Sequence, residues 1–300
     1  MLNFNPVTVD SLEDIRYYFQ FQDYRTCDFT IGGMFMWAFF FKYEYAIFQE
    51  TLFIKGVSEI DPTETAFSVP IGKLHFHESL AVLKEYCIRN NINLVLSAVP
   101  ENVKDKIISI YPFVSYKLTN WADYLYDSQS LAFLSGRLYN KKRNHINKFK
   151  QMYPDGIIYD KITDTNLQEI QAFFRLFHSQ NEKDNPIFQN EAVMTEYVLS
   201  NYKRFNFIGL SMKEKNRVIG FIIGEILSDT VYIHIVKADK SYAGVYETLN
   251  KKFIIDIINE YPEIKFVNME EDVGDEGLRQ FKLSYHPIAI LNKYNLIYGD

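Results

Sequence analysis

Two stretches of this chain repeat one pattern: Thr8–Phe19 reads TVDSLEDIRYYF, and Thr163–Phe174 reads TDTNLQEIQAFF. Thr, Leu, Ile and Phe coincide, and each stretch predicts a short strand that turns into a capped helix. Ser11 with Asp14, and Thr165 with Gln168, approximate the spacing at which side chains satisfy the first helical N–H groups. Because twelve residues can match by chance, the order of the surrounding elements must agree as well.

The order of predicted elements also repeats. Apolar residues spaced by 3.6, as in Leu249, Phe253 and Ile257, predict helices, and β-branched or aromatic runs between turns predict strands. The first half predicts further helices at 29–41, 75–89 and 101–110, and strands at 45–48, 52–55, 66–69, 93–98 and 114–117. The second half predicts further helices at 191–201, 245–260 and 277–283, and strands at 206–212, 217–227, 231–236 and 265–268. Both halves therefore read strand, two helices, three strands, helix, strand, helix, which indicates a duplicated α/β domain, divided as residues 1–128 and 129–300.

A basic segment lies where the halves join. Residues 136–150 contain six Lys or Arg, one His and no acid, in a protein of formal net charge -6. On a helix, Lys141, His145 and Lys148 share one face, while Leu138, Ile146, Phe149 and Tyr153 can pack against a core. Cations held in this way suit phosphate, carboxylate or RNA, although a solvated helix face or a hinge would have the same composition.

Composition sets limits on the class of protein. Apolar residues make up 47% of the chain, whereas Gly (13) and Pro (9) are scarce, so large cores are expected and disorder is not. Basic residues (32) do not outnumber acidic ones (38), which argues against general nucleic-acid coating. Cys27 and Cys87 give neither a disulfide framework nor the spacing of a metal site. With no signal peptide and no apolar run long enough for a membrane helix, we expect a soluble cytoplasmic protein without a bound metal.

The element order resembles the GNAT acyltransferase fold, in which a splayed mixed sheet holds a donor cofactor. Two such domains in tandem resemble the Fem-type transferases, which move amino acids from aminoacyl-tRNA. Over nearly its whole length the chain is similar to the phosphatidylglycerol lysyltransferase C-terminal-like family. The segments that carry this similarity are 28–37, 141–149, 238–246 and 268–287. The resemblance implies an α/β (α+β mixed sheet) fold of two tandem GNAT-like acyltransferase domains, although no Gly-rich pyrophosphate loop is present.

The loop before the helix at 245–260 is the predicted donor site. In the GNAT arrangement this helix N-terminus receives the donor's phosphates, because free N–H groups and the helix dipole favour an anion. Gly244 would allow close approach of the backbone, although an ordinary strand-to-helix turn would also place Gly there. With the basic segment, the donor-binding candidates are Lys141, Lys142, Arg143, His145, Lys148, Lys237, Tyr242 and Gly244.

The tail 268–287 holds the predicted reacting groups. Strand ends in open α/β sheets are where ligands usually bind, and ionisable residues gather there in this chain. Glu270, Glu271 or His286 could act as general base, and Tyr285 could protonate a leaving group. Arg279 and Lys282 could hold a carboxylate or phosphate, or could simply pair with the nearby acids.

Two further polar residues lie on neighbouring predicted strands. Glu225 and His234 could face each other across an antiparallel pair, and an internal hydrogen bond is the favoured interpretation.

These observations predict an acyl- or aminoacyl-transferase. Its anionic donor would be an aminoacyl-tRNA or a coenzyme A thioester, used as a co-substrate rather than as a tightly bound cofactor. Its acceptor would be an amine or a hydroxyl of a small or lipid-like molecule. A non-catalytic module that binds a small anionic ligand or RNA is the alternative, and an acetyltransferase that uses acetyl-CoA is a third possibility.

Overall fold

The computed structural model describes residues 1–154, 156–181 and 185–299. The chain forms two compact units. Unit 1 comprises Met1–Asp123, Glu271–Gly274 and the chain from Ile290 onward, and unit 2 comprises Tyr124–Glu270 and Asp275–Ala289. Each unit is an α/β domain built on its own mixed sheet.

Unit 1 carries a sheet in the order β1-β2-β3-β4-β6-β15-β7, with the short β5 paired to β3. The β4–β6 pair is parallel, whereas the other pairs are antiparallel. The strands are β1 (Asn5–Pro6), β2 (Glu44–Phe48), β3 (Thr51–Val57), β4 (Thr65–Phe67), β5 (Ile71–Gly72), β6 (Val95–Pro100), β7 (Phe113–Lys117) and β15 (Lys293–Tyr298). The helices are α1 (Leu12–Phe19), α2 (Ile31–Ala38), α3 (Phe76–Asn90) and α4 (Glu101–Ile108).

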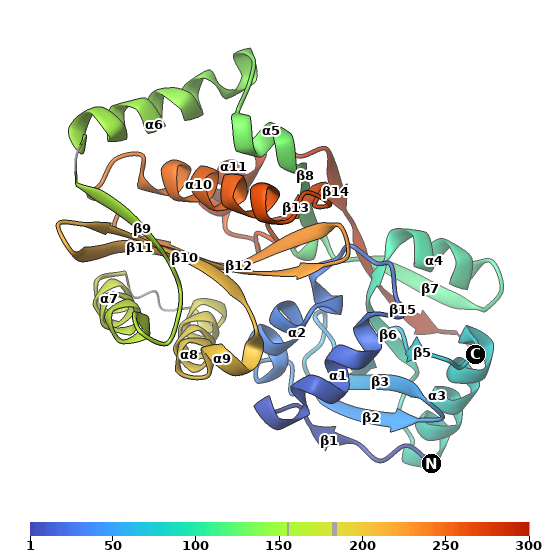
Figure 1. Cartoon of the computed structure of the whole chain (residues 1–300). Helices are drawn as coiled ribbons and strands as arrows, with labels where there is room; N and C mark the ends of the chain where they lie inside the picture. The colour runs from blue at the N-terminus through green and yellow to red at the C-terminus, as the bar shows by residue number, and fades with distance from the viewer. Residues whose placement is uncertain (155, 182–184, 300) are drawn as a thin grey trace. The chain divides into compact units, whose positions relative to one another are not determined.

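Unit 2 carries a sheet in the order β14-β8-β13-β12-β11-β10-β9, with β12 and β13 parallel. The strands are β8 (Asp123–Asp127), β9 (Ile157–Lys161), β10 (Ile208–Glu214), β11 (Arg217–Leu227), β12 (Thr230–Ala238), β13 (Phe266–Asn268) and β14 (Ala289–Leu291). The helices are α5 (Ser128–Phe133), α6 (Asn140–Met152), α7 (Leu167–Gln180), α8 (Pro186–Ser200), α9 (Tyr202–Phe205), α10 (Val245–Glu260) and α11 (Glu276–Leu283). Helices α7 and α8 cover one face of the sheet and α10 covers the other, as Figure 1 shows.

The apolar periodicity of α10 explains how it packs. Leu249, Phe253 and Ile257 are buried in one core cluster with residues of β11, β12 and α6. Ile146 and Phe149 of α6 belong to the same cluster. Leu138, which the periodicity places on this buried face, is 69% exposed because it lies in the irregular turn before α6 begins.

The repeated element order is confirmed, and so is the α/β class with two mixed sheets. The predicted caps differ in detail. Helix α1 begins after Ser11 without a side-chain cap hydrogen bond, and α7 begins after Asn166, one residue beyond the expected Thr165. Asn166 is held instead by the chain before it, through bonds to Thr163 N and to the carbonyl of Lys161.

Each sheet is completed by a strand from outside its own half of the sequence. Strand β15, at the end of the chain, lies between β6 and β7 in unit 1. Strand β8, at the end of the first half, lies between β13 and β14 in unit 2. The chain thus leaves each unit and re-enters it. Strands that are distant in sequence can pair in this way, because antiparallel pairing requires only a free strand edge.

The sequence predicts a single boundary at 128/129, and the chain crosses between the two units at several points. The crossing at Asp123/Tyr124 falls close to it, but the chain also crosses at 270/271, 274/275 and 289/290. Residues 290–299 complete the sheet of unit 1 rather than that of unit 2. Within the described residues, every helix is too short or too polar to cross a membrane.

Candidate functional site

Strands β12 and β13 of unit 2 pair over only three residues. Thr230, Val231 and Tyr232 are in register with Phe266, Val267 and Asn268, whereas β12 continues to Ala238. The two strands therefore part beyond Tyr232 and Asn268. His234 follows the last pair by two residues on β12, and Glu270 follows it by two residues on the other chain segment.

The His234 imidazole lies between two carboxylates. Its Nδ1 is 2.7 Å from Glu270 Oε1, and its Nε2 is 3.3 Å from Glu225 Oε2 on β11. The His234 side chain is fully buried and packs against the Phe207 ring, whereas 15% of the Glu270 side chain is exposed. The imidazole is thus held inside the unit. Of the two carboxylates that contact it, that of Glu270 is the more exposed.

The charge of His234 follows from these neighbours. Burial alone would lower its pKa, but the negative charges and hydrogen bonds of Glu270 and Glu225 raise the pKa to about 9. His234 is therefore an imidazolium at neutral pH and donates to both carboxylates.

The backbone at Glu270 is strained. Its φ is +60°, in the left-handed region that few non-glycine residues adopt. The Asn268 side-chain oxygen accepts a hydrogen bond from the Glu270 N–H at 2.6 Å and stabilises this turn. Strain of this kind is often found where a side chain must be aimed at a reacting group.

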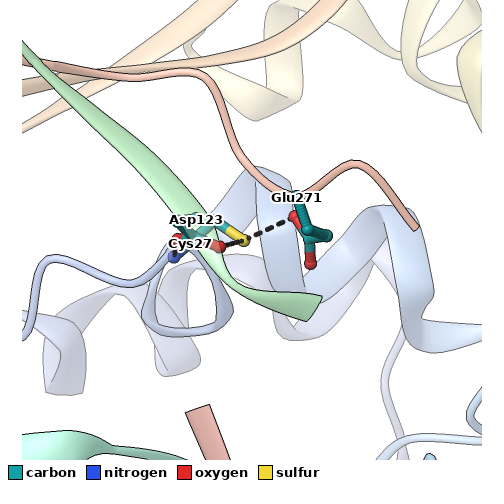
Figure 2. A group of neighbouring side chains, drawn as sticks. All are labelled: Cys27, Asp123 and Glu271. Carbon is teal, nitrogen blue, oxygen red and sulfur yellow. Dashed lines mark hydrogen bonds between the residues drawn. The ribbon is translucent and has the colours of Figure 1, made fainter. Parts of the chain in front are cut away.

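Unit 1 contains a second group of buried ionisable residues, brought together from segments far apart in the sequence. Figure 2 shows Cys27, Asp123 and Glu271 pointing toward one another. Asp123 Oδ2 accepts from the Cys27 N–H at 2.6 Å, and Cys27 Sγ lies 3.1 Å from Glu271 Oε2. Burial raises the pKa of the Cys27 thiol well above its ordinary value, and Asp123 and Glu271 raise it further.

A buried ammonium, that of Lys293, lies among the same atoms. Its Nζ is 2.7 Å from both Asp28 Oδ2 and Asp123 Oδ1, and 3.4 Å from both Glu271 Oε1 and Cys27 Sγ. Burial would lower the pKa of Lys293, but these partners raise it well above its ordinary value. Burial also raises the pKa of Asp28 to about 7, against the opposing charge of Lys293.

Three residues of this group have ligand atoms that suit a metal ion. A thiol and two carboxylates offer ligand atoms within 4.8 Å of one another, a set that suits Zn²⁺. The Lys293 ammonium, however, already lies at the centre of these acceptors and provides a cation there. We therefore assign the group, which we call the Lys293 cluster (Cys27, Asp28, Asp123, Glu271 and Lys293), a structural role in unit 1.

The residues of the basic segment divide into buried and exposed positions. Lys142 is buried, with its Nζ 3.9 Å from the centre of the Tyr285 ring and 3.7 Å from Glu247 Oε1. Burial lowers the pKa of Lys142, and Glu247 opposes that shift. His145 also contacts Glu247, at 2.9 Å. Lys142 and His145 thus connect α6 to the first turn of α10.

Arg143 and Lys150 of the same segment form a basic surface with Lys251 of α10. Lys141, Lys148 and Lys150 are exposed, and Arg143 donates to the carbonyl of Gly136 at 2.7 Å. Lys251 of α10 lies close to this group: burial lowers its pKa, and the charges of Lys150 and Arg143 lower it further. Cations of α6 and α10 therefore share one surface.

The loop before α10, which is the predicted donor site, packs in a way that its sequence does not indicate. Gly244 has φ +89°, and a Cβ there would lie 2.5 Å from the carbonyl oxygen of His145. The close approach that Gly244 permits is therefore that of α6. Lys237 pairs with Glu191 at 2.6 Å, and the Tyr242 ring contacts that of Tyr153.

A surface hollow of about 230 Å³ lies beside this loop. Its lining includes Lys240 and Ser241 of the loop, Arg217 at the start of β11, and Phe173, Leu176 and Phe177 of α7. The hollow thus combines two cations and the Asp239 carboxylate, which lies 4.0 Å from Arg217, with an apolar wall.

The predicted tail residues do not form one site. Glu270 contacts His234 in unit 2, whereas Glu271 belongs to the Lys293 cluster of unit 1. Tyr285 is buried beside Lys142, and burial raises its pKa well above the ordinary value. His286 is exposed and lies 3.3 Å from the carbonyl oxygen of Leu138. Arg279 lies 3.7 Å from Glu276, and Lys282 is buried near the Tyr124 ring.

Comparison with known proteins supports the architecture. A solved protein of unknown function from Bacteroides thetaiotaomicron is 28% identical, with a TM-score of 0.88 over 100% of both chains. The L-PGS of Bacillus licheniformis is 11% identical, with a TM-score of 0.68 over 95% of this chain and 91% of its own. The uncharacterized protein MYCGA3080 of Mycoplasmoides gallisepticum is 24% identical over 173 residues, 57% of this chain and 54% of that protein. The chain thus spans about half the length of that curated relative.

The family described as phosphatidylglycerol lysyltransferase, C-terminal, matches residues 19–297, which is nearly the whole chain. The matched range includes the sheet of unit 2, the sheet of unit 1 apart from β1 and the last residue of β15, the basic helix α6 and the Glu225–His234–Glu270 group. The chain therefore belongs to the phosphatidylglycerol lysyltransferase C-terminal family.

Proposed function

We propose that this protein is an acyl- or aminoacyl-transferase whose reaction takes place in unit 2, beside Glu270. The observation that carries the proposal is the position of the Glu270 carboxylate, just beyond the point where β12 and β13 part. In the GNAT arrangement the opening between these two strands holds the donor. Family membership and the transferase-like fold support the same conclusion.

Glu270 suits the role of general base in this reaction. Its Oε1 is held by His234, and Oε2 has no hydrogen-bond partner among the described residues. An acceptor amine or hydroxyl would give its proton to Oε2 while its nitrogen or oxygen attacks the acyl carbonyl carbon. The bond from that carbon to the ribose oxygen or the thiol sulfur of the donor then breaks, and the leaving group takes up a proton.

The basic surface of α6 and α10 supports an anionic donor. Lys150 and Lys251, with Arg143 beside them, lie on two packed helices, so their backbone positions are fixed before any ligand arrives. Such a surface attracts a polyanion by charge alone, and its binding weakens as salt rises. This behaviour suits a charged tRNA better than a small thioester.

The test is transfer by the Glu270→Gln variant. The wild type would be offered charged tRNAs, lysyl-tRNA included, and acyl-CoA thioesters, with phosphatidylglycerol and simple amines as acceptors. We expect Glu270→Gln to lose at least about 100-fold in rate, the usual contribution of a positioned base. Glu276→Gln, which changes an exposed acid of α11 with the same charge difference, should retain its rate.

A binding module without catalysis is the second candidate. Gly244 and Lys142 favour it, because α6 and the rings of Phe281 and Tyr285 occupy the places expected for a donor. Such a module would show salt-sensitive RNA binding, with no transfer by the wild type from any donor. Detectable transfer that requires Glu270 would exclude it.

A further inference from the structure

We propose that His234, fixed by Glu225, is a positioning residue that holds Glu270 Oε1 and thereby presents Oε2 for the proton of the acceptor. This inference rests on the proposed function and deepens it, because it assigns roles to two buried residues behind the reacting carboxylate. Three features carry it: the register of the sheet, the contacts of His234 and the turn at Glu270.

The sheet register singles out His234. Strands β11 and β12 pair regularly up to Ile223 and Ile235, but the next pair is Gly224 with Ile233. His234 is therefore the extra residue of a β-bulge, without a partner across the ladder. Bulges bend a strand and re-aim a side chain, and they occur frequently beside active sites.

Gly224 makes this bulge possible. A Cβ on Gly224 would lie 2.5 Å from the carbonyl oxygen of Tyr232, so a side chain there would push the two strands apart. The bulge also shifts the pairing so that Glu225 lies opposite Tyr232. Glu225 Oε2 thereby comes within 3.3 Å of His234 Nε2.

The Nδ1 side of the imidazole is also fixed. His234 Nδ1 lies 2.7 Å from Glu270 Oε1, and the Glu270 backbone is held at φ +60° by the Asn268 side chain. Both ends of the Nδ1–Oε1 hydrogen bond are thus placed by the backbone. Glu270 cannot turn Oε1 toward an acceptor without breaking this bond.

Charge supports the same role. The titratable groups that face His234 are Glu225 from β11 and Glu270 from the segment after β13, and its apolar neighbour is Phe207. The pKa of His234 rises to about 9 between these carboxylates. The positive imidazolium attracts the Glu270 carboxylate and strengthens the hydrogen bond that holds Oε1.

Two substitutions separate positioning from structural support. The amide nitrogen of Asn takes the place of Nδ1, so His234→Asn keeps a donor for Glu270. The amide of Gln reaches the place of Nε2, so His234→Gln keeps the bond to Glu225 and removes the bond to Glu270. The same pair at His178, a partly exposed histidine of α7, serves as the control.

In the transfer assay we expect His234→Asn to keep its rate within about 10-fold and His234→Gln to lose about 100-fold, with KM little changed. The pH–rate profile of His234→Asn should also change, because the amide carries no charge. Equal losses in both variants, in proportion to their loss of stability, would overturn the proposal.

A second readout does not depend on transfer. NMR of ¹⁵N-labelled histidine should show His234 as an imidazolium through neutral pH, and its pKa should fall in Glu225→Gln and in Glu270→Gln. If His234 is neutral at pH 7, or if neither substitution moves it, the proposal fails even where Glu270→Gln abolishes transfer. If NMR shows the expected charge of His234 but Glu270→Gln transfers at the wild-type rate, the proposed function fails instead.

Discussion

Lys142 and Lys293 are both buried lysines, yet their surroundings shift their pKa values in opposite directions. Lys142 has two aromatic rings and one carboxylate near it, so burial prevails and its pKa falls. Lys293 has three carboxylates and a thiol within 3.4 Å, so attraction prevails and its pKa rises. Composition along the chain gives no sign of this difference, because the partners of Lys293 lie at positions 27, 28, 123 and 271.

Lys293 is therefore a residue whose substitution should be costly. In Lys293→Met the buried acceptors of the Lys293 cluster lose their central cation, and breaking a buried ion pair typically costs about 3–5 kcal/mol. Urea unfolding should show a lower midpoint by a corresponding amount. Lys106→Met, at an exposed position of α4 in the same unit, should leave the midpoint unchanged. A wild-type midpoint in Lys293→Met would contradict the assigned role.

His234 predicts a dependence of stability on pH. Its pKa in the folded protein, about 9, lies above the ordinary value of 6.5. The stabilisation it provides is therefore fully present below pH 6.5 and is lost as the pH rises through 9. The difference in melting temperature between wild type and His234→Gln should be largest near pH 6 and should shrink above pH 9. A difference that stays constant over this range would count against a charged His234.

Part of the residue-level site is predictable from the sequence. Glu270 stands out because it follows a strand in a cluster of ionisable residues. The Glu225–His234 bond is predictable as an internal contact. The bulge that aims His234 at Glu270 is not, because it depends on the pairing register and has no local pattern in the sequence. The Lys293 cluster is not predictable in this way, since its members come from segments that are separated by 22 to 266 residues.

At the scale of elements, helix α6 shows how one basic segment serves two purposes. Lys142 and His145 face α10 and its Glu247, whereas Lys141, Lys148 and Lys150 are exposed. Helical periodicity predicts a packed basic helix, but it does not show that Lys142 lies on the packed side.

Charge reversal on α6 and α10 tests the basic surface. Lys150→Glu with Lys251→Glu should weaken tRNA binding and reduce the slope of log affinity against log salt by about one for each phosphate that the variant no longer binds. The fold should persist, because both side chains are at least partly exposed. Lys203→Glu, at a highly exposed position of α9, is the control. Unchanged binding and slope in the double variant would place the polyanion elsewhere.

Most helices and strands are predictable, because their periodicity is a local property of the chain. Helix α10, predicted at 245–260, is observed as Val245–Glu260, and β11, predicted at 217–227, as Arg217–Leu227. Strands β8, β14 and β15 are missing from the prediction. Two of them complete a sheet beside strands distant in sequence, so their pairing is set by the tertiary fold rather than by their own pattern.

At the scale of the whole molecule, the exchanged strands make each unit depend on chain from outside its own half. Unit 1 needs β15 from the chain end, and unit 2 needs β8 from the end of the first half. Truncation after Ala289 should therefore destabilise unit 1 as a whole, since it separates β6 from β7 and removes Lys293. Hydrogen exchange should show reduced protection in β2, β3 and β6, whereas truncation after Tyr298 should leave it unchanged. Retained protection without β15 would contradict this dependence.

Glu270 and Glu271 are neighbouring acids of the same tail that belong to different units, and comparing them tests whether the reaction takes place at Glu270. Transfer should be measured for Glu270→Gln and Glu271→Gln at a temperature where both are folded. We expect Glu270→Gln to lose some stability with the charge beside His234 and, where folded, to transfer at least about 100-fold more slowly. Glu271→Gln should be less stable but should keep its rate per folded molecule. Transfer by Glu270→Gln at the wild-type rate would contradict a reaction at this carboxylate.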